Sequence, residues 1–211
     1  MHGSGTRPGS AGHLLVDGER PLPGTSEGAR IPGLLLPVLA LALVALLDLI
    51  AAAHPWPIPL VGALDEPAHV LTAWLCLAAL PRRCISTAWP WTLIGVVAID
   101  LDHLPLYLWG GPLAEPGGRP VPHSLATVLL LLGLALMYPR GRAILCGLAA
   151  GVALHLTRDV AGGPGVPLWW PLASTGLRVP YSAYFTVLAA VAAAATWRAF
   201  RRGGAISSRD G

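Results

Sequence analysis

The stretch "GLLLPVLALALVALLDLIAAA" (33–53) decides the fold class, because it is a long apolar segment interrupted by a single charged residue, Asp48. About 20 apolar residues are enough for a helix to cross a bilayer. The segment is longer than the roughly 7–15 apolar residues of a cleaved signal peptide, although Ala51 to Ala53 would suit a small-residue cleavage site. We predict a retained membrane helix, with cleavage as the alternative.

The rest of the chain has the composition of a membrane protein. Of its 211 residues, 54% are hydrophobic and 12% are charged, whereas soluble domains carry about 25% charged residues. Further apolar segments follow at 66–80, 88–108, 123–138, 143–159 and 181–199. We therefore predict an all-α, polytopic membrane helix bundle with about six transmembrane helices in residues 33–200. Residues 1–32 are predicted to form a disordered cytoplasmic tail and 201–211 a short cytoplasmic tail.

The positions of the arginines predict the orientation of these helices. Short cytoplasmic loops are enriched in Arg. The loops between alternate apolar segments hold Arg82, Arg83, Arg140 and Arg142, and the last segment is followed by Arg198, Arg201 and Arg202. Both termini are then cytoplasmic, and loops 54–65, 109–122 and 160–180 lie outside the plasma or inner membrane. These arginines are scattered and not interleaved with aromatic residues, which argues against a nucleic-acid partner. The expected partners are membrane lipids and an amphiphilic small molecule.

Ionisable residues gather on one side of the predicted bundle. The apolar segment around "VVAIDLDHLPLY" (96–107) contains two carboxylates and an imidazole, groups that are costly in hydrocarbon and usually line a cavity, a relay or a metal site. In the predicted topology, five segments bring such residues to the outer face: Asp48, His54, Asp65, His69, Asp100, Asp102, His103, His123, His155 and Asp159. The inner loops contain no His, Asp or Glu. This asymmetry predicts a one-sided polar site.

The spacing of these residues suits a metal site. The pairs Asp65/His69 and His155/Asp159 are four residues apart, so each pair can share one face of a helix. Imidazoles and carboxylates are the ligands of zinc, manganese and iron sites in hydrolases. The predicted metal ligands are Asp65, His69, Asp100, His123, His155 and Asp159. We expect a divalent ion, zinc in the first place and manganese or magnesium as alternatives. Two ions, or one ion and a base, both agree with the number of ligands.

Simpler explanations exist for some of these residues. A single histidine at a membrane interface is more often solvated than bound to a metal, and an isolated Asp/His pair is more often a local hydrogen bond. Asp48 and Asp65 could instead pair with Arg158 or Arg178. The gathering of several such groups on one face favours the metal site.

Three short motifs resemble the YdjM-like family of membrane-bound metal-dependent hydrolases. They are "IDLDH" (99–103), "GRPVPHS" (118–124), and "LHLTRD" (154–159) followed by "GGPGVPLWWPL" (162–172). Their order and spacing agree with the family over residues 65 to 172. The resemblance implies that the family's metal-site residues fall on Asp100, Asp102, His123, His155 and Asp159.

The chain departs from the family's pattern at two positions. Gly118 stands where the family has its first histidine, and Pro122 replaces a threonine. The missing imidazole implies a different number of metal ions, a substitute ligand from His103 or His69, or a degenerate member without activity.

Site and resemblance together predict an enzyme, a hydrolase that attacks a phosphoester or another ester of an amphiphilic or lipid substrate at an extracytoplasmic site. Arg119 and Arg158 are candidate phosphate clamps. His103 or Asp102, whichever is not a ligand, is the candidate general base. The alternatives are a metal-ion or proton transporter and a non-catalytic membrane protein. A phosphatase with a phosphohistidine intermediate is disfavoured, because its motif requires a lysine and the chain has none.

Overall fold

The computed structural model describes residues 30–82, 86–104, 122–163 and 165–207. Its helices are α2 (Arg30–Ala53), α3 (Ile58–Ala79), α5 (Trp89–Ala98), the 3-10 helix η1 (Ile99–Asp102), α7 (Leu125–Met137), the 3-10 helix η3 (Pro139–Gly141), α8 (Arg142–Asp159) and α9 (Tyr181–Ser207). An isolated β-bridge joins Val166 to Leu177, and these described ranges contain no β-strand. The prediction of an all-α fold is therefore confirmed.

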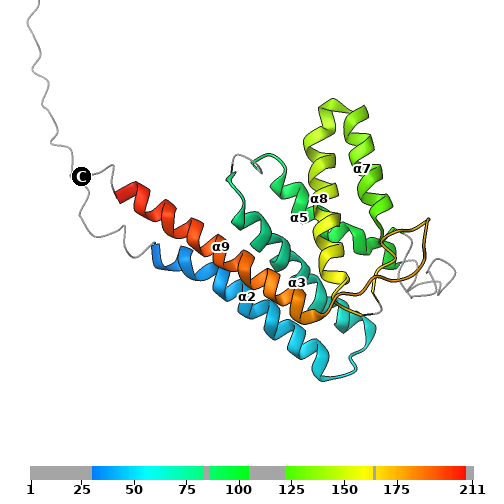
Figure 1. Cartoon of the computed structure of the whole chain (residues 1–211), viewed down its shortest axis with the longest axis horizontal. Helices are drawn as coiled ribbons and strands as arrows, with labels where there is room; N and C mark the ends of the chain where they lie inside the picture. The colour runs from blue at the N-terminus through cyan, green and yellow to red at the C-terminus, as the bar shows by residue number, and fades with distance from the viewer. Residues whose placement is uncertain (1–29, 83–85, 105–121, 164, 208–211) are drawn as a thin grey trace, which may run out of the picture.

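The helices form two groups (Figure 1). Helices α2, α3 and α9 pack together around a core of Ala40, Val44, Leu75, Leu188 and Ala192. Helix α8 packs against both α5 and α7, and a second core there consists of Ile99, Val152, Leu156 and Val166. Because α3 contacts both α5 and α8, it joins the two groups.

Two described helices are long and apolar enough to cross a membrane, over Gly33–Ala53 in α2 and Tyr181–Arg202 in α9. Only 17% of each of these segments is buried inside the protein, so their apolar side chains largely face outward. Helix α5 has 10 residues, a length of about 15 Å, and hydrocarbon cores are about 30 Å thick. Six spanning helices, with both termini in the cytoplasm, therefore stay a prediction.

Glycines bring α5 and α8 unusually close together. A Cβ atom at Gly95 would lie 2.5 Å from a backbone oxygen of α8, and one at Gly151 would lie 2.7 Å from the backbone nitrogen of Val96. Gly147 and Gly151 are four residues apart, and His155 follows after four more, so all three lie on the face of α8 that meets α5. Small residues at such a spacing allow two helix backbones to touch. The backbone of α5 can therefore reach His155.

Candidate metal centre

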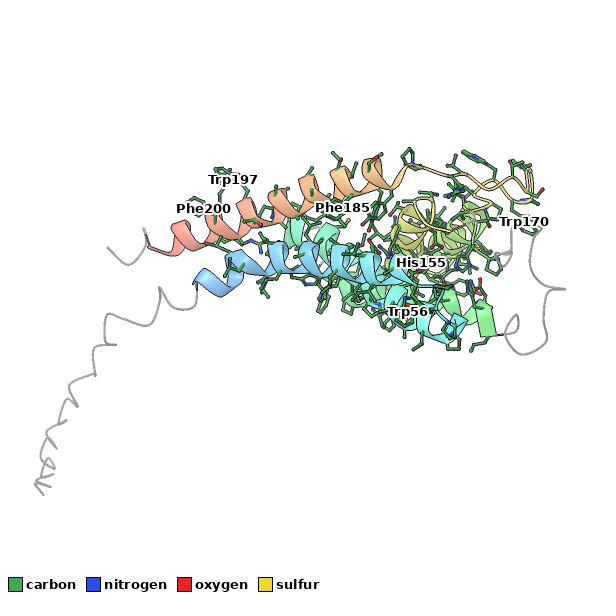
Figure 2. All side chains as sticks on the ribbon, turned by 90° about the horizontal axis from the view of Figure 1, so that it is seen from below. Trp56, His155, Trp170, Phe185, Trp197 and Phe200 are labelled. Carbon is green, nitrogen blue, oxygen red and sulfur yellow. The ribbon has the colours of Figure 1, made fainter. Side chains whose placement is uncertain are left out.

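The last turn of α8 supplies a buried imidazole and a buried carboxylate. His155 and Asp159 are 1% and 2% exposed, and the Nε2 atom of His155 lies 3.3 Å from Oδ2 of Asp159. One turn of helix fixes this separation, as the spacing of four predicts. Figure 2 shows His155 in the interior, behind α2 and α3.

Two neighbouring segments bring further ligand atoms to the same point. Helix α5 tightens into η1, and this turn directs Asp100 toward α8, while His123 precedes α7. Asp100 Oδ1 lies 3.0 Å from His123 Nε2 and 3.3 Å from His155 Nε2. His123 Nε2 lies 3.7 Å from Asp159 Oδ2. Ligands held tetrahedrally by zinc at about 2.0–2.1 Å are separated by about 3.3–3.4 Å. The separations of 3.0–3.7 Å between these carboxylate and imidazole atoms are close to that ligand–ligand distance.

His69 brings a third imidazole, from α3. It is 2% exposed, and its Nε2 atom lies 3.2 Å from Asp159 Oδ1. Its ring stacks on that of His155, with centroids 3.8 Å apart. His69 was one of the two predicted substitutes for the histidine that Gly118 replaces, and it lies at the centre.

The orientation of the three rings is typical of metal ligands. The Nδ1 atom of His155 donates a hydrogen bond to the carbonyl of Val96 (2.8 Å), and that of His69 donates to the carbonyl of Asp65 (3.0 Å). The Nδ1 atom of His123 lies 2.9 Å from Asp102 Oδ2. Histidine ligands usually place their second nitrogen on a carbonyl or carboxylate in this way.

These hydrogen bonds leave an electrostatic requirement at the centre. A carbonyl oxygen cannot donate, so the proton of a neutral His69 or His155 sits on Nδ1 and its Nε2 presents a lone pair. Those lone pairs face carboxylate oxygens, and Nε2 of His155 has no hydrogen-bond partner. Acceptors that face one another need a cation between them, either a second proton on the ring or a metal ion. The donor set fits a divalent metal.

Glu66 is a site residue that the sequence prediction missed. Its side chain hydrogen-bonds to Asp100, and its Oε2 atom is buried without a partner. Glu66 precedes His69 by three residues on α3, a spacing that places both on one helix face, so the signal was present in the sequence. Two carboxyl groups hydrogen-bond only when one of them holds a proton, so the Glu66–Asp100 pair shares a proton and adds no second negative charge to the centre.

The two predicted bases lie beside this centre. His103 Nδ1 is 2.9 Å from Asp102 Oδ1 and 3.5 Å from Asp100 Oδ1. Ligand atoms of Asp100, Asp102, His103 and His123 lie within 4.8 Å of one another, as do those of His69, His155 and Asp159. Of the other predicted catalytic residues, Arg119 lies outside the described residues.

The carboxylate of the predicted ligand Asp65 is paired with Arg158, and its Oδ1 atom also lies 3.7 Å from Nδ1 of His69. Oδ1 of Asp65 accepts a hydrogen bond of 2.8 Å from Arg158, which also donates to both carboxylate oxygens of Asp48 and to the hydroxyl of Tyr184. Tyr181 donates to Asp48 as well (2.7 Å). The structure thus shows the simpler pairing of Asp48 and Asp65 with Arg158. The phosphate clamp at Arg158 stays a prediction, and its guanidinium already bonds two carboxylates.

A cavity of about 920 Å³ borders the centre. Asp100, His103 and Asp159 line it, together with the Arg158 network and residues of α2, α3 and α9. In the loop after α8, Ala161, Gly162 and Gly163 also line the cavity. The following part of the loop packs elsewhere, because Val166 is fully buried and Leu168 accepts a hydrogen bond from the amide of Leu125. Trp170 accordingly lies well away from His155 (Figure 2).

Fold and site together define a helical protein whose described residues include two apolar helices of membrane-spanning length and a buried cluster of histidines and carboxylates. The YdjM inner membrane protein family matches residues 64–208, so the chain belongs to this family. The match confirms the resemblance seen in the three motifs, and the family's description makes this an inner membrane protein. No curated protein and no solved structure matches the chain. Helix α2 lies before the matched residues.

Proposed function

We propose that the protein is a metal-dependent hydrolase of the inner membrane, acting on a phosphoester or another ester of an amphiphilic substrate at a site on the extracytoplasmic side. The observation that supports this most strongly is the arrangement of His69, His123 and His155. Each ring has Nδ1 on an acceptor and Nε2 toward the carboxylates at the centre.

The proposed ligands are the three histidines together with Asp100 and Asp159. Zinc is the first candidate, with manganese or magnesium as alternatives, because imidazole and carboxylate suit each of these ions to a different degree. A bound divalent ion supplies Lewis acidity, which makes water a nucleophile near neutral pH. The adjoining cavity gives a substrate access to the ligands Asp100 and Asp159. A purely structural metal site has no need of such access.

The chain's own residues have separate roles in this proposal. Asp102 accepts a hydrogen bond from Nδ1–H of His123 and so orients that ring. His103 lines the cavity beside Asp102 and Asp100, and its side chain is 15% exposed. It is therefore placed to take a proton from water, as a general base does.

A transporter is the second candidate function, because membrane histidines and aspartates also form ion pathways. The ligand-type residues of the described chain gather at one end of α8, whereas a pathway requires polar groups across the bundle. Zinc flux into vesicles that contain the protein would favour the transporter.

The proposal is tested by a matched pair of variants, Asp159→Asn and Asp65→Asn. Both changes keep the side chain's shape and remove its charge, but only Asp159 faces the three imidazoles. We expect purified Asp159→Asn to lose zinc and the hydrolysis of phosphatidic acid together, and Asp65→Asn to retain zinc. If Asp65→Asn loses the metal while Asp159→Asn keeps it, our assignment of the metal ligand to Asp159 on α8 is wrong, and the ligand is Asp65 on α3.

A further inference from the structure

The cavity beside the metal centre has an apolar half. Its wall is formed by Ala45, Leu49 and Ala52 of α2, Val61 and Gly62 of α3, and Phe185 of α9. Small side chains dominate this wall and leave the space open. At about 920 Å³, the cavity is at the upper end of the range of about 300–1,000 Å³ that is typical of small-molecule sites.

The charged groups in the wall are already paired. Arg158 bonds Asp48 and Asp65, and Tyr181 donates to Asp48. These groups therefore satisfy one another, and the wall between them and the metal centre offers mainly hydrocarbon contacts to a ligand. An ionic, water-soluble ligand would have to displace these bonds, whereas a hydrocarbon chain would not.

Two of the helices that form the wall, α2 and α9, have the length and composition of membrane helices. Leucines such as Leu39 and Leu46 cover the outer side of α2. Moving a chain from the bilayer into the cavity exchanges one apolar environment for another, since lipid tails are as apolar as leucine. Entry from the membrane therefore costs little.

We propose that the cavity binds a hydrocarbon chain of the amphiphilic substrate, with α2 as one wall, and that this places the ester bond at the metal centre. The inference rests on the proposed function and adds the part of the substrate that the protein recognises. It also gives a role to α2, which lies before residues 64–208 matched by the family.

The experiment uses the full chain in phosphatidylcholine nanodiscs with two photoreactive probes. One probe is phosphatidic acid with a diazirine on its acyl chain, and the other is a polyprenyl phosphate with a diazirine on its isoprenoid chain. The test variant is Gly62→Phe, because a Cβ atom at Gly62 meets nothing within 4 Å and the ring can enter the cavity. The matched control is Gly133→Phe on α7, where a Cβ atom also meets nothing and the cavity is absent.

We expect at least one probe to crosslink to the cavity side of α2, at Ala45 or Leu49, and the reacting probe identifies an acyl or an isoprenoid chain. Gly62→Phe should lower this crosslinking and the hydrolysis of the same lipid by about tenfold. Its zinc content should equal that of wild type, and Gly133→Phe should change neither crosslinking nor hydrolysis.

The inference is overturned if neither probe reaches the cavity side of α2, or if Gly62→Phe crosslinks there as well as Gly133→Phe does. The proposed function fails differently. In that case the protein neither holds a metal nor hydrolyses lipid, while the crosslinks in the cavity are unchanged.

Discussion

Replacing Gly151 by alanine should weaken metal binding, although Gly151 touches no ligand of the centre. A Cβ atom there would lie 2.7 Å from the backbone nitrogen of Val96, about 0.7 Å less than the 3.4 Å at which ordinary contact begins, and the backbone oxygen of Thr92 would be closer still. The atoms nearest to this Cβ are all backbone atoms of α5, so a change of side-chain rotamer cannot relieve the clash. Helix α5 must withdraw, and it carries the Val96 carbonyl that accepts the 2.8 Å hydrogen bond from His155.

The size of the effect follows from that displacement. A shift of at least about 0.7 Å lengthens the 2.8 Å hydrogen bond to about 3.5 Å or more, where little of its energy remains. Losing the partner that orients a metal-bound histidine typically costs about 10–100-fold in metal affinity. Overfilling a packed interface costs about 1–3 kcal/mol of stability. We therefore expect Gly151→Ala to raise the Kd for zinc by about 10–100-fold and to lower Tm.

The assay is competition for zinc with a fluorescent chelator, together with thermal unfolding, in one detergent. Gly133→Ala is the matched control, because a Cβ atom at Gly133 meets nothing within 4 Å. Replacing glycine by alanine inside a helix otherwise stabilises it by about 0.8–1 kcal/mol. Equal zinc affinity and equal Tm in the two variants would refute the reasoning, because they would show that α5 does not need this close approach to hold His155.

Three further outcomes are expected. Removing the metal with EDTA should lower Tm, and zinc restored to about 100 times its Kd should return about 2.7 kcal/mol of stability; an unchanged Tm would argue against a site formed in the fold. Asp48→Asn should destabilise the protein by about 3 kcal/mol, because it removes one of the two carboxylates on the buried Arg158; urea titration of Asp48→Asn beside wild type measures this. A cysteine at Ser174 should react with a membrane-impermeant maleimide added outside spheroplasts, and labelling from the cytoplasmic side alone would reverse the predicted topology.

Most of the residues of the candidate site could be predicted from the spacing of histidines and aspartates within short segments of the sequence. The pair His155/Asp159 could be predicted because a helix fixes the geometry of residues four apart, and α8 forms as expected. The motif "IDLDH" supplied Asp100, whose direction depends on the 3-10 turn that ends α5. Glu66 was missed because Asp65 and His69 already formed a plausible pair on the same helix.

Long-range pairing was harder to predict. The sequence around Asp65 does not predict that its carboxylate bonds Arg158, which lies 93 residues further along the chain, and does not join the metal centre. That choice follows from how α3 and α8 pack. The contact between α5 and α8 at Gly95, Gly147 and Gly151 has a spacing signal in the sequence, but the partner helix and the register are set by packing. The number of membrane spans also cannot be derived from helix length alone, because a short helix can lie within the bundle without crossing the bilayer.

The bond between Asp48 and Arg158 has a consequence for the biosynthesis of the protein. These two residues are 110 positions apart. The ribosome therefore completes α2 long before it adds Arg158, whose guanidinium neutralises the Asp48 carboxylate. At about 5–20 residues per second, the delay is about 5–20 seconds. Asp48 lies in the last third of the apolar segment Gly33–Ala53, so it raises the insertion energy by less than the roughly 2.5–3.5 kcal/mol that an aspartate costs at the centre of a membrane helix. If α2 crosses the membrane as predicted, its leucines must supply the insertion energy, because the Asp48 carboxylate has no cationic partner until α8 is translated.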